Sequence, residues 1–145
     1  MSSTRYVSTR GAAPELGFTE VLLAGLANDG GLYVPQDWPM LPARVPGSTY
    51  AQRAAQIMQL FVGDDIAPAT VQRLCDEAYA TFAHPAVVPL VQLHHEHFVQ
   101  ELFHGPTLAF KDVALQLVGR MFDEVLRAQG RRVTIVGATS GDTGS

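Results

Sequence analysis

The last third of the chain has an order of segments that strongly limits the possible folds. Between Phe110 and Leu126, apolar residues recur at helical spacing and predict a largely buried helix that ends near Gln129–Gly130. Residues 132–137 are rich in β-branched side chains and predict a buried strand. A loop rich in glycine, serine and threonine follows at residues 138–145. Helix, buried strand and loop in this order are typical of the start of an α/β domain with a parallel sheet.

The first part of the chain has a different pattern and predicts a small, mainly helical domain. Helical spacing of apolar residues predicts three helices, over residues 18–27, 50–62 and 68–84. Short extended segments are expected at residues 5–9 and 32–34, separated by a turn at Asn28–Gly31. We therefore predict two domains: a helical one at residues 1–84, and an incomplete catalytic one that begins at residues 85–145.

A β-hairpin is predicted at the start of the second domain. Its strands are expected at residues 87–93 and 98–103, on either side of His94-His95-Glu96-His97. The histidines resemble a metal-binding cluster, but adjacent residues on a strand point to opposite faces and helical histidine spacing is absent. We interpret the segment as a solvated turn and predict no metal.

The composition excludes several classes of protein. With 47% apolar and 17% charged residues, the 145-residue chain is expected to be soluble and folded. Its net charge of −4, without a basic run beyond Arg131-Arg132, does not favour nucleic acid or an anionic membrane as a partner. No apolar run approaches the roughly 20 residues of a membrane span. The single cysteine, Cys75, is expected in the core and fits a cytoplasmic protein.

Lys111 is the only lysine, and the other basic residues are all arginines. A lone amine in such a chain indicates a need that a guanidinium cannot meet, such as attack on a carbonyl. It lies near the start of the predicted helix, after the turn Gly105-Pro106-Thr107. The alternative is an ordinary surface lysine whose stem packs on apolar neighbours.

The loop at residues 138–145 is expected to lead into a helix and could bind an anion through its backbone N–H groups. It matches neither a Walker loop nor the dinucleotide-binding pattern of glycines. Asp142 would repel a bare phosphate, so a zwitterionic ligand suits the loop better. The alternative is a turn in which Asp142 caps a helix.

Four segments together resemble the threonine synthase family. Glu101–Asp112 resembles its pyridoxal-phosphate attachment segment, and Ala138–Gly144 resembles its next motif. Tyr6–Arg10 and Asp29–Pro35 are similar to the opening of its N-terminal domain. The resemblance implies a fold-type II pyridoxal-phosphate enzyme that converts O-phospho-L-homoserine and water to L-threonine and phosphate.

The resemblance also implies roles for individual residues. Lys111 would hold the pyridoxal 5'-phosphate and act as acid and base. Its neighbours Phe110 and Asp112 would help to place the lysine and would contribute to cofactor binding. The substrate's amino-acid end would be received by four residues of the loop: Ser140, Gly141, Asp142 and Thr143.

The family's phosphate cradle and most of its sheet have no counterpart before Ser145. The resemblance therefore implies an N-terminal fragment that is inactive alone and needs the rest of the same catalytic domain. Two alternatives stay open. One is another fold-type II enzyme, such as a serine/threonine dehydratase or a cysteine synthase, although these typically have Asn where Asp142 stands. The other is a non-catalytic fragment or homologue that acts by association.

Overall fold

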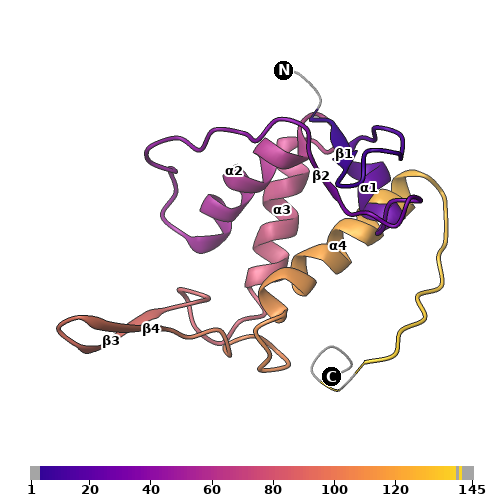
Figure 1. The fold of residues 1–145 in the computed structure, drawn as a ribbon. Helices are drawn as coiled ribbons and strands as arrows, with labels where there is room; N and C mark the ends of the chain where they lie inside the picture. The colour runs from indigo at the N-terminus through magenta and orange to yellow at the C-terminus, as the bar shows by residue number, and fades with distance from the viewer. Residues whose placement is uncertain (1–3, 140, 142–145) are drawn as a thin grey trace. The chain divides into compact units, whose positions relative to one another are not determined.

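The computed structural model describes residues 4–139 and residue 141 (Figure 1). In chain order its elements are β1 (Tyr6–Ser8), α1 (Phe18–Ala24), β2 (Tyr33–Pro35), α2 (Tyr50–Val62), α3 (Pro68–Tyr79), β3 (Leu90–His94), β4 (His97–Gln100) and α4 (Asp112–Ala128). The chain forms two compact units, one of Met1–Gly47 with Gln52–Arg73 and one of Ser48–Ala51 with Leu74–Ser145. The domain division at residue 84 stays a prediction.

The first unit is built on the antiparallel pair β1–β2, in which Tyr6 lies opposite Pro35 and Ser8 opposite Tyr33. Tyr6 is buried and donates its hydroxyl hydrogen to the Phe61 carbonyl at 2.8 Å. Burial, with a smaller contribution from the negative charge of Asp65, raises the pKa of Tyr6 to about 12. The strand therefore enters the apolar core with its polar group satisfied.

The turn predicted at Asn28–Gly31 is held by the side chain of Asp29. Ser8 Oγ donates to Asp29 Oδ1 at 2.7 Å, and the N–H of Gly31 donates to the same oxygen at 2.9 Å. The N–H of Ala12 donates to Asp29 Oδ2 at 3.0 Å. These bonds, that from Ser8 first, lower the pKa of the Asp29 carboxyl. One carboxylate thus connects β1 to the turn before β2.

Helices α2 and α3 follow the local signals for helix ends. Pro68 is the first residue of α3, where its missing N–H has no intrahelical role. Gly63, with φ of 61°, follows the last residue of α2. Helix α3 ends at Tyr79, before the expected residue 84, and the Thr81 hydroxyl donates to the Ala78 carbonyl at 2.7 Å.

Cys75 lies in the core of the second unit, as predicted, and is fully buried. Burial and the nearby Asp76 charge raise its pKa to about 11. Tyr79 lies edge-on to Tyr50, with ring centroids 4.7 Å apart, and donates its hydroxyl hydrogen to the Val113 carbonyl at 3.3 Å.

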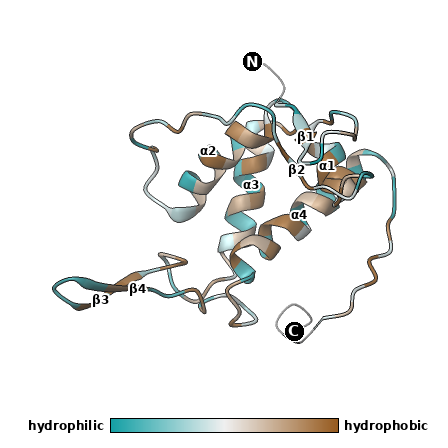
Figure 2. Ribbon diagram, in the orientation of Figure 1, coloured by the Kyte–Doolittle hydropathy of each residue, from teal (hydrophilic) through white to brown (hydrophobic). Residues whose placement is uncertain are grey.

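The predicted hairpin is present as the antiparallel pair β3–β4, although β4 ends at Gln100 instead of residue 103. Its register is irregular between Gln92 and His94, and its turn is hydrophilic (Figure 2). Almost every residue of both strands is exposed, including Leu90, Leu93 and Phe98.

Helix α4 is buried on one face only, which corrects the prediction of a largely buried helix. Leu117, Met121 and Val125 recur at every fourth position and are buried. Leu115, on another face, is 43% exposed. Phe110 precedes the helix and is 58% exposed. Within the described part of the chain, the face of α4 that carries Leu117, Met121 and Val125 is the one whose apolar side chains are buried.

The strand predicted at residues 132–137 is also wrong for this structure. Residues 131–139 have no regular secondary structure, and Ile135 and Val136 are 78% and 90% exposed. A parallel strand needs hydrogen-bonding neighbours. The described strands pair only as β1–β2 and β3–β4, both antiparallel, so no strand is available to residues 132–137.

Candidate active site around Lys111

The segment Gly105–Lys111 forms the loop that leads into α4. The N–H of Leu108 donates to the Gly105 carbonyl at 3.1 Å, and the N–H of Asp112 donates to the Ala109 carbonyl at 3.0 Å. Leu108 has a φ of 62°, which is uncommon for a residue with a branched side chain. The loop is therefore two successive tight turns joined at a strained residue.

Asp112 closes this loop with its side chain. The backbone N–H of Thr107 donates to Asp112 Oδ2 and the Thr107 hydroxyl donates to Oδ1, each at 2.9 Å. Asp112 is only 3% exposed, so these charge-assisted bonds are shielded from water. A Cβ added to Gly105 would overlap the Asp112 side chain, which explains why the loop has a glycine there.

Lys111 caps the N-terminus of α4 with helical backbone angles, φ −64° and ψ −22°. Its carbonyl accepts the N–H of Leu115 at 2.8 Å, so its backbone already belongs to the first turn. The side chain is half-buried, and Nζ lies 5.7 Å from the centroid of the Phe110 ring. The predicted position near the helix start is confirmed, while the roles of Lys111, Phe110 and Asp112 stay predictions.

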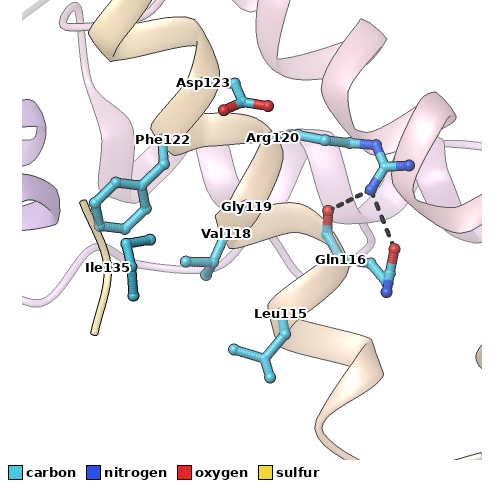
Figure 3. Close-up of a pocket in the computed structure, with 8 residues that line it drawn as sticks. All are labelled: Leu115, Gln116, Val118, Gly119, Arg120, Phe122, Asp123 and Ile135. Atoms are coloured by element: carbon cyan, nitrogen blue, oxygen red, sulfur yellow. Dashed lines mark hydrogen bonds between the residues drawn. The ribbon is translucent and has the colours of Figure 1, made fainter. Parts of the chain in front are cut away.

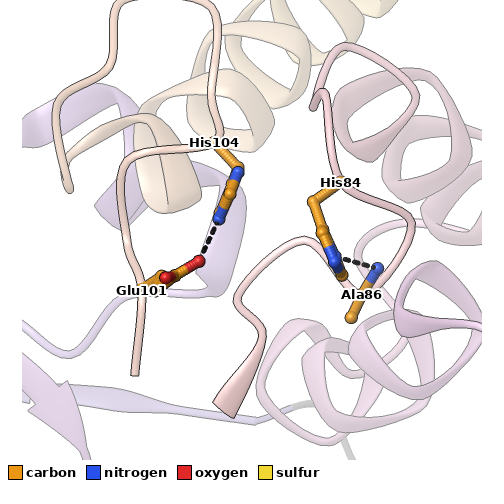
Figure 4. Close-up of polar contacts among 4 residues, drawn as sticks. All are labelled: His84, Ala86, Glu101 and His104. Atoms are coloured by element: carbon orange, nitrogen blue, oxygen red, sulfur yellow. Dashed lines mark hydrogen bonds and ion pairs between the residues drawn. The ribbon is translucent and has the colours of Figure 1, made fainter. Parts of the chain in front are cut away.

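A second polar pair lies just before the loop (Figure 4). His104 Nε2 is 2.6 Å from Glu101 Oε2, and both side chains are largely shielded, at 19% and 25% exposure. The His104 ring lies 5.1 Å from that of His84, whose Nδ1 accepts the N–H of Ala86. Sequence reasoning assigned no role to Glu101 or His104. Their spacing of three residues in a non-helical segment carried no signal of contact.

The structure describes little of the predicted substrate loop. Ser140, Asp142 and Thr143 lie outside the described residues. Gly141 is exposed, has a φ of 138°, and donates its N–H to Thr139 Oγ1 at 3.3 Å. The site therefore brings Phe110, Lys111 and Asp112 together, and the loop's role stays a prediction.

An open hollow of about 690 Å³ lies along the exposed side of α4 (Figure 3). Leu115, Val118 and Phe122 line it, and Ile135 lies beside Phe122. Arg120 bonds along the helix, donating to the Gln116 carbonyl at 2.7 Å. Gln116, Arg120 and Asp123 also line the hollow, whereas Lys111 does not, so this hollow is not the pocket of the amine.

The histidine-rich turn has its own contacts. The rings of His94 and His95 have centroids 4.3 Å apart, and His95 is 3.7 Å from the Glu96 carboxylate in exposed surroundings. Within the described residues, no group of three or more His, Cys, Asp or Glu side chains has an arrangement suited to a metal ion. Among residues 4–139, no helix is long and apolar enough to cross a membrane.

Comparison with known proteins identifies the class to which this fold belongs. A structure of a PLP-bound threonine synthase from Brucella melitensis matches 98% of this chain and 32% of its own, with a TM-score of 0.93 and 57% identity. Threonine synthases from Pseudomonas aeruginosa and Schizosaccharomyces pombe are 56% and 43% identical over 97% and 99% of this chain. The fold is that of the N-terminal region of these enzymes, which confirms the predicted fold class.

The family described as "Threonine synthase N terminus" matches residues 5–79. The chain therefore belongs to the threonine synthase family, as its motifs predicted. It spans about a third of the length of the relatives it matches, 31% and 30% for the two curated enzymes.

Proposed function

We propose that this chain is the N-terminal part of a threonine synthase, a pyridoxal-phosphate-dependent carbon–oxygen lyase. The reaction would convert O-phospho-L-homoserine and water to L-threonine and phosphate. The observation that carries the proposal is the segment Glu101–Asp112, in which the chain's only lysine stands at the start of α4. Family membership and the similarity to a PLP-bound threonine synthase support it.

The side chains at the start of α4 suit an aldehyde cofactor. A primary amine adds to an aldehyde carbonyl, and Lys111 is the only side chain here that has one. Phe110 beside it presents a flat apolar ring. Pyridoxal phosphate, when bound, supplies an electron sink for charge that develops on substrate carbons.

Lys111 has two roles in this proposal. It would hold the cofactor, and its Nζ would take protons from substrate carbons and return them. Phe110 and Asp112 would help to place it. Ser140, Gly141, Asp142 and Thr143 would receive the amino-acid end of the substrate, since a loop of backbone N–H groups and hydroxyls suits a carboxylate.

The proposal includes a need for the rest of the catalytic domain. The apolar side of α4, with Leu115, Val118 and Phe122 around an open hollow, is a surface that a sheet could cover. Residues 1–145 alone would then lack threonine synthase activity. A cytoplasmic location is part of the same proposal and fits the free thiol of Cys75.

The experiment is borohydride reduction of the full-length holoenzyme, followed by digestion and mass analysis. The peptide that contains Lys111 should carry the pyridoxyl mass. Lys111→Arg keeps the positive charge but removes the nucleophile, so it should lose both the label and the visible absorbance of bound cofactor. Arg127→Ala, at an exposed position on the same helix, is the matched control and should keep both. A label on another residue would reject the proposal.

A further inference from the structure

We propose that Asp112 is a positioning residue for Lys111 and that it acts through Thr107, by holding the Gly105–Lys111 loop closed. The inference rests on the proposed function, in which Lys111 carries the cofactor. It replaces the predicted direct role of Asp112 toward the cofactor with a role toward the loop.

The hydrogen bonds define where the carboxylate acts. One Asp112 oxygen accepts the Thr107 N–H and the other accepts the Thr107 hydroxyl, both at 2.9 Å. The side chain is 3% exposed, so water does not compete for these oxygens. Both oxygens are thus directed back along the chain, toward a residue that precedes Lys111.

The backbone of the loop shows why such a closure is needed. Leu108, directly after Thr107, has a φ of 62° and is 72% exposed, so its own side-chain packing does not compensate for this backbone conformation. Strained backbone persists only where its surroundings hold it. The Asp112 side chain bonds to Thr107, the residue before Leu108, and Asp112 directly follows Lys111. The side chain therefore ties the start of the strained segment to the helix start at its other end.

Gly105 supplies the space for this closure. A Cβ there would overlap the Asp112 Cβ and Oδ2 and lie 2.7 Å from Cγ. The loop therefore packs its own backbone against the carboxylate, with no room for a side chain between them. The consequence is a defined position for the Lys111 backbone relative to Thr107, and reactive groups lose function when their position shifts by about 1 Å.

A double-mutant cycle in the full-length enzyme tests the inference, with cofactor affinity from visible absorbance and borohydride labelling of Lys111 as readouts. Asp112→Ala should weaken cofactor binding about tenfold or more, and Thr107→Val, which changes only one group, by less. The double variant should bind within about twofold of Asp112→Ala, because the two residues act through one contact.

Conservative variants separate positioning from general destabilisation. Thr107→Ser keeps both hydrogen bonds and should bind the cofactor like the wild type. Asp112→Asn keeps an acceptor for the Thr107 N–H and should fall between Asp112→Ala and the wild type. Arg127→Gln, at an exposed position near the other end of the same helix and outside the hollow, is the control and should leave cofactor binding unchanged.

Amide hydrogen exchange at Thr107 in the apo enzyme reports on the loop without the cofactor. Asp112→Ala should speed this exchange. Faster exchange with unchanged cofactor affinity would overturn the inference, and so would additive effects in the cycle. A borohydride label on a residue other than Lys111 would instead reject the proposed function, so the two failures are distinguishable.

Discussion

Two segments with strand-like sequences differ completely in outcome. Residues 33–35 pair with β1. A further hydrogen bond extends the pair at each end: Thr9 N–H donates to the Leu32 carbonyl at 2.8 Å, and Gln36 N–H donates to the Arg5 carbonyl at 2.9 Å. Residues 132–137 have a stronger β-branched composition, yet they are exposed and form no strand.

The difference shows that a partner matters more than intrinsic preference. Strand propensity largely reflects packing against neighbouring strands, so it stabilises nothing when no neighbour is present. For β2 the partner lies earlier in the same unit. For residues 132–137, none of the described strands serves as one.

The largest effect expected from this comparison is in amide hydrogen exchange of residues 1–145. The amides of Thr9 and Gln36 should exchange slower than random coil by roughly a hundredfold or more, because each is bonded within a folded unit. The amides of Val133–Val136 should exchange near the random-coil rate. The same amides in the complete enzyme serve as the control and should become protected. Strong protection of Val133–Val136 in monomeric 1–145 would contradict the comparison.

A smaller effect should separate the two faces of α4. Met121 is 1% exposed, so Met121→Ala should lower the free energy of unfolding by about 2–5 kcal/mol. Leu115 is 43% exposed, and Leu115→Ala in 1–145 should change it by less than about 0.5 kcal/mol. Urea unfolding followed by circular dichroism measures both.

The complete enzyme gives the matching control for these variants. If the Leu115 face is covered there, Leu115→Ala should become markedly more destabilising than in 1–145. Equal costs of Leu115→Ala in the two proteins would contradict the idea that this face packs on the rest of the domain.

The smallest effect concerns the pH dependence of the β1–β2 pair. The folded-state pKa of Asp29 is lowered, mainly by the Ser8 hydroxyl, so its contribution to stability is present above the unfolded-state pKa of about 4. It is lost as the pH falls through the lower folded-state pKa. Urea midpoints at pH 7 and pH 3 should therefore differ less for Asp29→Asn than for wild type. Ser8→Ala should lie between them, and an unchanged difference in Asp29→Asn would contradict the account.

Local signals made most of the fold predictable. The turn at Asn28–Gly31, the first residue of α3 at Pro68 and the end of α2 before Gly63 are all marked by the residue types at those positions. The strand at residues 132–137 depends on partners that local sequence does not specify. The prediction that α4 is largely buried failed for the same reason, since apolar spacing does not say which faces of a helix have neighbours.

The candidate site shows the same division. The sequence was sufficient to place Lys111 at the start of a helix, because its turn and the apolar spacing are local. The bonds between Asp112 and Thr107 enclose a left-handed Leu108, a conformation for which leucine gives no signal. The contact of Glu101 with His104 likewise depends on the path of an irregular segment.

Because Cys75 is buried, the rate at which its thiol reacts can report how often the core of the second unit opens. The thiol is fully buried, and burial raises its pKa to about 11, so neither access nor thiolate favours reaction in the folded state. It is also the chain's only cysteine. A thiol-reactive dye therefore has one target in these residues. The rate at which the dye labels Cys75 measures the opening of the core, and no engineered probe is needed.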